Sequence, residues 1–91
     1  MRREDDFFGD QELVLIYIGK RLSESKAVEK LLDEADIDYL VEPDRYRGGV
    51  LFIRELIGAF FYVTEDKADI ARDLLRAAKH AVYVPGGQPA T

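Results

Sequence analysis

A continuous apolar run of six residues, Leu13–Ile18, limits the folds open to this chain more than any other segment. The run is short, contains β-branched residues and ends at Gly19, which predicts a buried strand rather than a helix. Because successive side chains of a strand point to opposite faces, both faces of this strand are apolar. The fold must therefore cover both faces of the sheet that the strand joins.

Two later segments have the helical period. Between residues 23 and 36, apolar residues recur every three or four positions and charged residues fill the other side. We predict a helix over 23–36 with Ser23 as its N-cap. We predict a second helix after Thr64, its cap, because Glu65 and Asp66 suit the positive end of a helix dipole. The predicted buried stripe of this helix comprises Ala68, Ala71, Leu74, Leu75 and Ala78.

Three further segments predict strands. Residues 37–41 alternate, and we expect Pro43 to end that strand because proline cannot donate to a ladder. Residues 50–63 fit either one bent strand or two short strands broken near Arg54-Glu55. Residues 81–84 predict a short last strand.

The predicted order of elements is β-α-β-β-(β)-α-β, and it indicates an α+β fold. Two strand–helix units with an antiparallel hairpin between them predict a ferredoxin-like two-layer sandwich, with both helices on one face of a mainly antiparallel sheet. The chain has 91 residues, which suits one domain. We assign 12–84 to that single α+β domain, 1–11 to a flexible N-terminal arm and 85–91 to a disordered tail.

Two helices cannot cover both faces of this sheet, so its other face should be apolar and aromatic. A patch of this kind usually marks an interface, and we predict a homo-oligomer, with a dimer favoured. The alternatives are that the arm, through Phe7 and Phe8, or the 43–57 loop covers the face, or that the face holds a ligand. The predicted interface residues are Leu15, Tyr17, Phe52, Phe60 and Tyr62.

The segment Arg45-Tyr46-Arg47 is the most distinctive predicted loop, because two guanidinium groups flank an aromatic ring. Such a group can bind a phosphate, a carboxylate or a base, and Arg54 can join it from the next strand. We therefore predict a candidate site for a small ligand or an unidentified protein partner. A solvated loop is the alternative, since nearby carboxylates offset the charge.

Composition excludes several function classes. With 13 basic and 18 acidic residues the net charge is −5, so we expect no nucleic-acid partner, since phosphate neutralisation supplies most non-specific affinity. A nucleic-acid binder would need Arg45, Arg47 and Arg54 on one face. The chain has no cysteine, which excludes disulfides and thiolate metal sites and agrees with a cytoplasmic location. No apolar run approaches the ~20 residues of a membrane helix, so we expect no membrane partner.

Candidates for catalysis are few. The only histidine, His80, lies at the predicted end of the second helix, where positive charge suits the dipole. The acidic residues of 33–38 lack the spacing of a calcium loop and fit a solvated turn. We predict no catalytic residue, no metal and no cofactor, and hence no enzyme. The alternative is a small dimeric ferredoxin-like enzyme or ligand-binding protein whose sheet-face pocket uses Tyr17, Tyr62 and His80.

Three segments carry a family resemblance: the opening strand 12–17, residues 25–41 with a Leu-Leu-x-x-Ala-x-Ile motif, and residues 62–75, where an acidic helix start follows a strand. Together they resemble a family of small bacterial domains of unknown function described as prokaryotic signal-transducing proteins. Thr64 stands where that family often has proline. The resemblance implies a ferredoxin-like fold, shared with oligomeric PII-type regulators, and a signalling role without catalytic residues. We therefore predict a self-associating regulatory or protein-interaction module.

Overall fold

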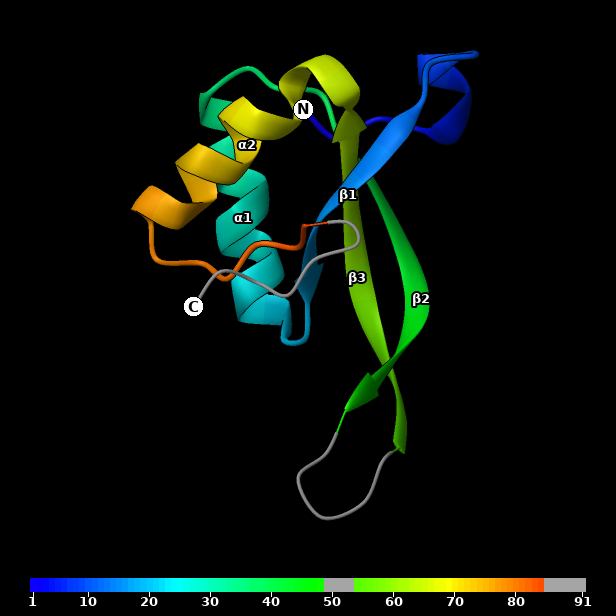
Figure 1. Cartoon of the computed structure of the whole chain (residues 1–91), viewed down its shortest axis with the longest axis vertical. Helices are drawn as coiled ribbons and strands as arrows, with labels where there is room; N and C mark the ends of the chain where they lie inside the picture. Colours follow the sequence, from blue (N-terminus) through cyan, green and yellow to red (C-terminus); the bar gives the residue numbers. More distant parts are fainter. Residues whose placement is uncertain (49–53, 85–91) are drawn as a thin grey trace.

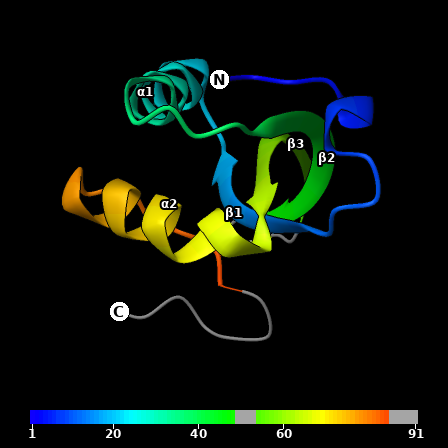
Figure 2. The ribbon, with the colours of Figure 1, turned by 90° about the horizontal axis from the view of Figure 1, so that it is seen from above.

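The computed structural model describes residues 1–48 and 54–84, which form an antiparallel sheet and two α-helices (Figure 1). The elements are a 3-10 helix η1 (Asp5–Phe8), β1 (Leu13–Gly19), α1 (Leu22–Glu34), β2 (Leu40–Gly48), β3 (Arg54–Thr64) and α2 (Glu65–Ala77). The strand order is β1-β3-β2, and both helices lie on one side of the sheet (Figure 2). The predicted α+β class is therefore confirmed.

The core lies between the sheet and the two helices. The sheet contributes Ile16, Phe61 and Val63, all fully buried, and the predicted stripe of α2 is buried at Ala71 and Leu75. Ala78, which we placed in that stripe, is exposed beyond the end of the helix. In the described part of the chain, no helix has the length and apolar character needed to cross a membrane.

A β-bulge in β1 decides which side chains enter this core. Leu15 lies opposite Tyr62 and Tyr17 lies opposite Phe61, so Ile16 has no opposite residue on β3. The extra residue reverses the alternation of faces, and Ile16 and Tyr17 both pack in the helix-side core. Our prediction that Tyr17 lies on the open sheet face is therefore wrong.

Strand β2 does not end at Pro43 but continues to Gly48. Pro43 lies opposite Ala59 within the ladder, and β2 is the last strand in the sheet order. An edge strand tolerates proline because the missing N–H can be one that would point to solvent. The predicted exposed loop is thus largely a β-hairpin.

Strand β3 runs without interruption from Arg54 to Thr64, so Arg54 and Glu55 lie within a strand and do not themselves interrupt one. Both residues pair with β2. The predicted strand residues 50–53, including Phe52, lie outside the described residues, as does the predicted tail 85–91.

Both helices end in the same way. Asp36 after α1 and Lys79 after α2 have positive φ angles of 57° and 67°. The next amide in each case donates back into the helix, from Ile37 to Leu32 O at 3.0 Å and from His80 to Leu75 O at 2.9 Å. This is the Schellman pattern, in which a left-handed residue stops the helix.

The helix starts differ from our prediction at α1. Its N-cap is Arg21, not Ser23, and α1 begins at Leu22. Thr64 is the N-cap of α2, as predicted. Neither cap residue makes a side-chain hydrogen bond to its helix within the described residues.

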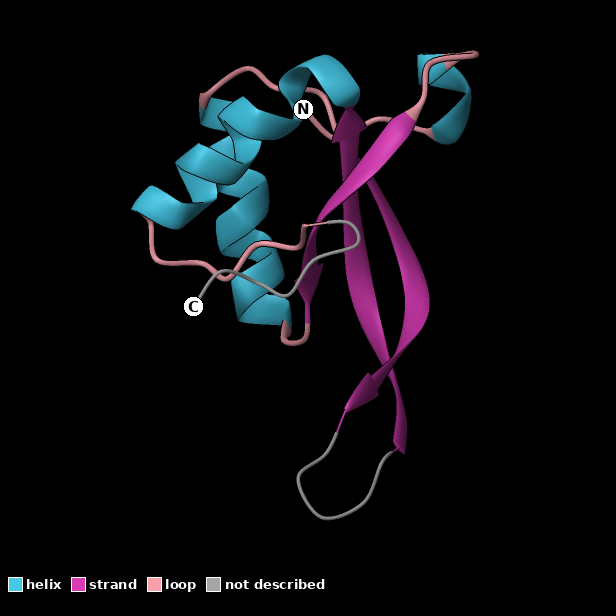
Figure 3. Cartoon of the chain, in the orientation of Figure 1, coloured by secondary structure: helices cyan, strands magenta, loops and turns pink. Residues whose placement is uncertain are grey.

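Residues 81–84 form no strand, and Figure 3 draws them as a loop. The Tyr83 amide donates to Ile16 O at 2.8 Å, which holds the segment beside β1. The guanidinium group of Arg72, buried on α2, donates to Tyr83 O at 2.9 Å and to Leu15 O at 3.0 Å. Our prediction of a last strand at residues 81–84 is therefore wrong. The Arg72 side chain hydrogen-bonds to the Tyr83 and Leu15 carbonyl groups, which a strand ladder would need as acceptors.

The N-terminal segment, which we predicted to be loose, contacts the sheet. Arg2 forms a parallel bridge with Tyr39, and the Arg3 amide donates to Tyr39 O at 2.8 Å. The segment then passes to the side of the sheet away from the helices, where η1 lies (Figure 2). Phe8 is only 3% exposed, although it is not part of the helix-side core. The segment therefore covers part of the face that we expected to be open.

Candidate functional site

The four residues of the predicted ligand loop lie along the β2–β3 hairpin but on both of its faces. Strand alternation places Arg45 and Arg47 on one face and Tyr46 with Arg54 on the other. Arg45 Nη1 lies 3.4 Å from Glu55 Oε2, and both side chains are exposed. The hairpin does not bring the arginines around the aromatic ring.

The predicted interface residues are also divided. Leu15 and Tyr62 lie opposite each other on the side away from the helices, and both are half-buried. Phe60 shares that face and is 8% exposed, whereas Tyr17 is in the helix-side core. Burial, and then the charges of Asp44 and Glu42, raise the pKa of the Tyr62 hydroxyl. This face is therefore only partly open.

A groove that we did not predict lies where β1 passes into α1, beside the β2–β3 hairpin. The hairpin extends beyond the helices here (Figure 1), and the groove has a volume of about 470 Å³. Leu22 and Ile57 line it, and at 72% exposed they are the most exposed large apolar residues in the described chain. We call it the hairpin groove, and its apolar wall comprises Leu22, Val41, Pro43, Ile57 and Ala59.

The remaining lining of the hairpin groove is polar and mainly basic. Arg2, Lys20 and Arg21 line it together with one carboxylate, Glu29. Arg2 Nη1 lies 3.7 Å from Glu29 Oε1. Within residues 1–48 and 54–84, Lys20 and Arg21 have no carboxylate within ion-pair distance. The groove thus has an excess of positive charge in an acidic chain.

Ser25 and Gly19 make a close contact inside this groove. Ser25 is only 6% exposed, and it is one of the two buried polar or charged residues in the described part of the chain. A Cβ atom added to Gly19 would lie 2.1 Å from Ser25 Oγ. We interpreted Gly19 only as a strand end, but its lack of a side chain is what lets α1 approach β1 here.

A second hollow of about 420 Å³, the Tyr17 cleft, shares Lys20 with the hairpin groove. The rings of Tyr17 and His80 meet edge to face there, with centroids 5.8 Å apart. Burial, and then the charge of Glu24, raise the pKa of the Tyr17 hydroxyl, so it stays protonated at neutral pH. Tyr62 lies on the other face of the sheet. The three polar residues suggested for an enzyme therefore do not converge.

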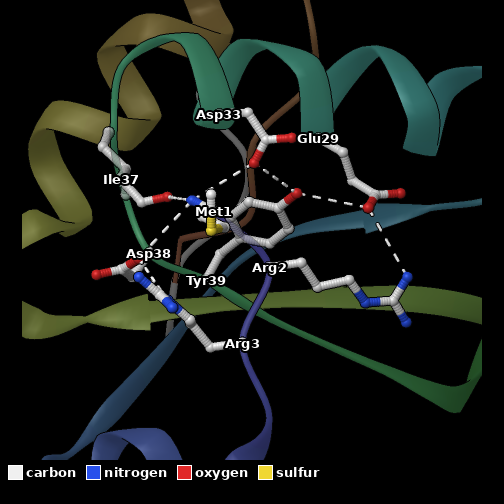
Figure 4. A network of polar contacts seen from close by, with 8 residues as sticks. All are labelled: Met1, Arg2, Arg3, Glu29, Asp33, Ile37, Asp38 and Tyr39. Atoms are coloured by element: carbon white, nitrogen blue, oxygen red, sulfur yellow. Dashed lines mark hydrogen bonds and ion pairs between the residues drawn. The ribbon is translucent and has the colours of Figure 1, made fainter.

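The acidic residues at the end of α1 contact the N-terminal segment in a polar network (Figure 4). The Tyr39 hydroxyl donates to Asp33 at 3.1 Å and to Glu29 at 3.4 Å. Arg3 Nε donates to Asp38 Oδ1 at 2.8 Å. The residues that the structure describes contain no group of three or more side chains suited to hold a metal ion. The turn that we predicted to be solvated is in part ion-paired.

Comparisons with protein-family models, with curated proteins and with solved structures found no match for this chain. The family resemblance of residues 12–17, 25–41 and 62–75 therefore remains a prediction. Function has to be argued from the surfaces described above.

Proposed function

We propose that the protein is a small non-catalytic regulatory module that self-associates through the hairpin groove. The observation that carries this proposal is the position of Leu22 and Ile57, each 72% exposed and both on one groove. Single exposed apolar residues are ordinary, but a contiguous apolar patch with a polar rim is typical of an interaction surface.

A second copy of the chain is the partner that this surface fits. The hairpin extends beyond the helices (Figure 1), and Ile57 lies on it next to the groove. Two-fold pairing would let the hairpin of each copy cover the groove of the other, so one self-complementary contact would remove both apolar side chains from water. Strand addition at the β2 edge is disfavoured by Pro43 and by the exposed charges of Glu42 and Asp44.

The separation of the polar side chains supports a non-catalytic role. A general acid and a general base must both reach one substrate. Tyr17 and His80 share a cleft, but Tyr62 lies on the opposite face of the sheet. The raised pKa of Tyr17 also makes it a poor base at neutral pH. A small dimeric enzyme is therefore the weaker alternative.

We also propose that the fold is a ferredoxin-like sandwich with an incomplete fourth strand. The order β1-β3-β2, with residues 81–84 beside the outer edge of β1, is consistent with that arrangement. This is the fold that the family resemblance implies, so it supports a signal-transducing role. The absence of cysteine supports a cytoplasmic location.

Light scattering over a concentration series tests the self-association. We expect the wild-type mass to approach twice the chain mass of 10.4 kDa and the Ile57→Asp variant to stay at 10.4 kDa. Ile70→Asp is the matched control, because Ile70 is 56% exposed on α2 and away from the groove, so this variant should remain dimeric. A wild-type mass of 10.4 kDa at every concentration would show the proposal to be wrong.

A further inference from the structure

The outer part of the β2–β3 hairpin has only two strands in the described part of the chain, and it carries Ile57. Strand β1 ends at Gly19, so residues 44–48 of β2 and 54–58 of β3 pair only with each other. We call these two segments the outer ribbon. A two-stranded ribbon is marginally stable by itself in water and twists strongly. The position of Ile57 relative to Leu22 therefore depends on a contact that holds the outer ribbon to the rest of the fold.

The ring of Tyr46 makes such a contact, on the face of the sheet away from the helices. A Cβ atom added to Gly58 would lie 3.0 Å from Tyr46 Cε1 and 3.0 Å from Ile18 Cγ2. The tyrosine of the ribbon and the isoleucine of β1 thus pack against one buried glycine. Glycine within a strand often marks a close approach of this kind. The lack of a side chain at Gly58 is what lets the Tyr46 ring lie there.

A cation on the same ring provides a second link. Lys20 Nζ lies 5.4 Å from the centroid of the Tyr46 ring, which is within the range of about 6 Å for a cation–π contact. Lys20 directly follows β1 and belongs to the segment that leads into α1. By contrast, the ion pair of Arg45 with Glu55 joins two residues of the outer ribbon to each other. The Tyr46 ring therefore connects the ribbon both to β1 and to the segment that leads to Leu22.

We propose that Tyr46 is a positioning residue for self-association, because its ring holds the outer ribbon so that Ile57 and Leu22 form one surface in the free chain. This inference rests on the proposed function, since it explains how the surface for the second copy is formed before the copies meet. Association is tighter when a surface is pre-organised, because less conformational freedom is lost on binding. Tyr46 and Ile57 lie on opposite faces of the ribbon, so the contribution of Tyr46 is indirect.

The dimer dissociation constants of Tyr46 variants, measured by light scattering, test this role. Tyr46→Ser removes the ring, and we expect self-association to weaken about tenfold because the outer ribbon must then be ordered on binding. Tyr46→Phe keeps the ring and should associate as the wild type does. Tyr83→Ser is the matched control, because it removes the same side chain at a 40% exposed position in the Tyr17 cleft. Tyr46 is half-buried outside the helix-side core, so Tyr46→Ser should still unfold cooperatively.

Backbone NMR order parameters test the ribbon contact without the dimer. The measurement uses the Ile57→Asp variant, in which we expect no second copy to cover the groove. Adding Tyr46→Ser should lower the order parameters of residues 44–48 and 54–58 from about 0.85 toward about 0.6, the range of flexible backbone. The order parameters of residues 13–18 should not change, because β1 pairs with β3 there.

Three results would overturn the inference: order parameters that Tyr46→Ser leaves unchanged, a Tyr46→Ser dimer as tight as the wild type, or an equal loss of association in Tyr46→Phe. Each of these leaves the proposed dimer standing if the wild type associates. A wild-type chain that stays monomeric refutes the proposed dimer and, with it, the role of Tyr46 in association. Lower order parameters in the same experiment would then confirm only that the ring holds the ribbon.

Discussion

The Tyr39 hydroxyl shows how one buried group makes stability depend on pH. Burial, followed by the hydrogen bond to Asp33 and the charges of Asp33 and Glu29, raises the pKa of this hydroxyl far above its usual value of about 10. In the unfolded chain the hydroxyl loses its proton first as the pH rises. Its contribution to stability is therefore complete below about pH 10 and is lost as the pH rises above that value.

We therefore expect Tyr39→Phe to unfold with a smaller dependence on pH than the wild type above about pH 10. At pH 7 the variant should lose about 1 kcal/mol, because the hydrogen bonds to Asp33 and Glu29 are gone. Urea unfolding measured between pH 7 and about pH 11 tests both expectations. Tyr83→Phe is the control, since Tyr83 is 40% exposed. Equal alkaline slopes for wild type and Tyr39→Phe would contradict the prediction.

Gly19 gives a second prediction at this scale. A Cβ atom there would lie 2.1 Å from Ser25 Oγ, so Gly19→Ala should lower the free energy of unfolding by about 1–3 kcal/mol through overpacking. Ser25→Ala removes the clashing oxygen, and the double variant should recover at least half of that loss. A double-mutant cycle in urea measures this coupling. Strictly additive effects of the two substitutions would mean that the contact is not the cause.

At the scale of elements, periodic patterns predicted most of the helices and strands, because those patterns reflect local burial. The strand from Leu13 and the helix after Thr64 agree with the structure within a few residues. Sequence did not reveal the bulge at Ile16 or the passage of Pro43 through β2, since both depend on the neighbouring strand. Ser23 looked like a cap by its residue type, but α1 starts one residue earlier.

The Arg72 side chain links residues 81–84 to β1 where a strand pairing would otherwise do so. Substitution of Arg72 should therefore detach residues 81–84 from β1. Arg72→Lys keeps the charge but cannot reach both Tyr83 O and Leu15 O with the same planar fork. We expect a loss of about 1.5–3 kcal/mol and faster hydrogen exchange at the Tyr83 amide. Arg76→Lys is the control, because Arg76 is exposed and its one ion pair within the described residues is with Asp73 of the same helix. If both variants lose the same stability, the bridging role of Arg72 is wrong.

At the scale of the whole molecule, the hairpin groove could not be predicted from the sequence. Its lining comes from the N-terminal segment, the β1–α1 connection, the first half of α1 and the two hairpin strands, so only tertiary packing joins Arg2, Ser25 and Ile57. The prediction that Arg45–Arg47 form a loop is wrong for a related reason, because they lie in strand β2. Three adjacent residues form one cluster in a loop, but in a strand their side chains alternate between faces.

The N-terminal segment gives the last prediction, because it covers a second apolar surface on the far side of the sheet (Figure 2). Phe8, Leu40 and Phe60 are all buried outside the helix-side core. Phe8→Ser should weaken the attachment of η1 and expose that face to other copies of the chain. Combining Phe8→Ser with Ile57→Asp distinguishes association through this sheet face from association through the hairpin groove.

We expect the double variant to show a mass that rises with concentration, while Ile57→Asp alone stays at 10.4 kDa. Phe7→Ser in the same background is the matched control, since Phe7 is the exposed member of the pair. Light scattering and dye binding to exposed apolar surface report the change together. A double variant that stays monomeric and binds no more dye would mean that Phe8 does not shield the sheet face. A rising mass would mean that the choice of self-association surface depends on the attachment of residues 1–8.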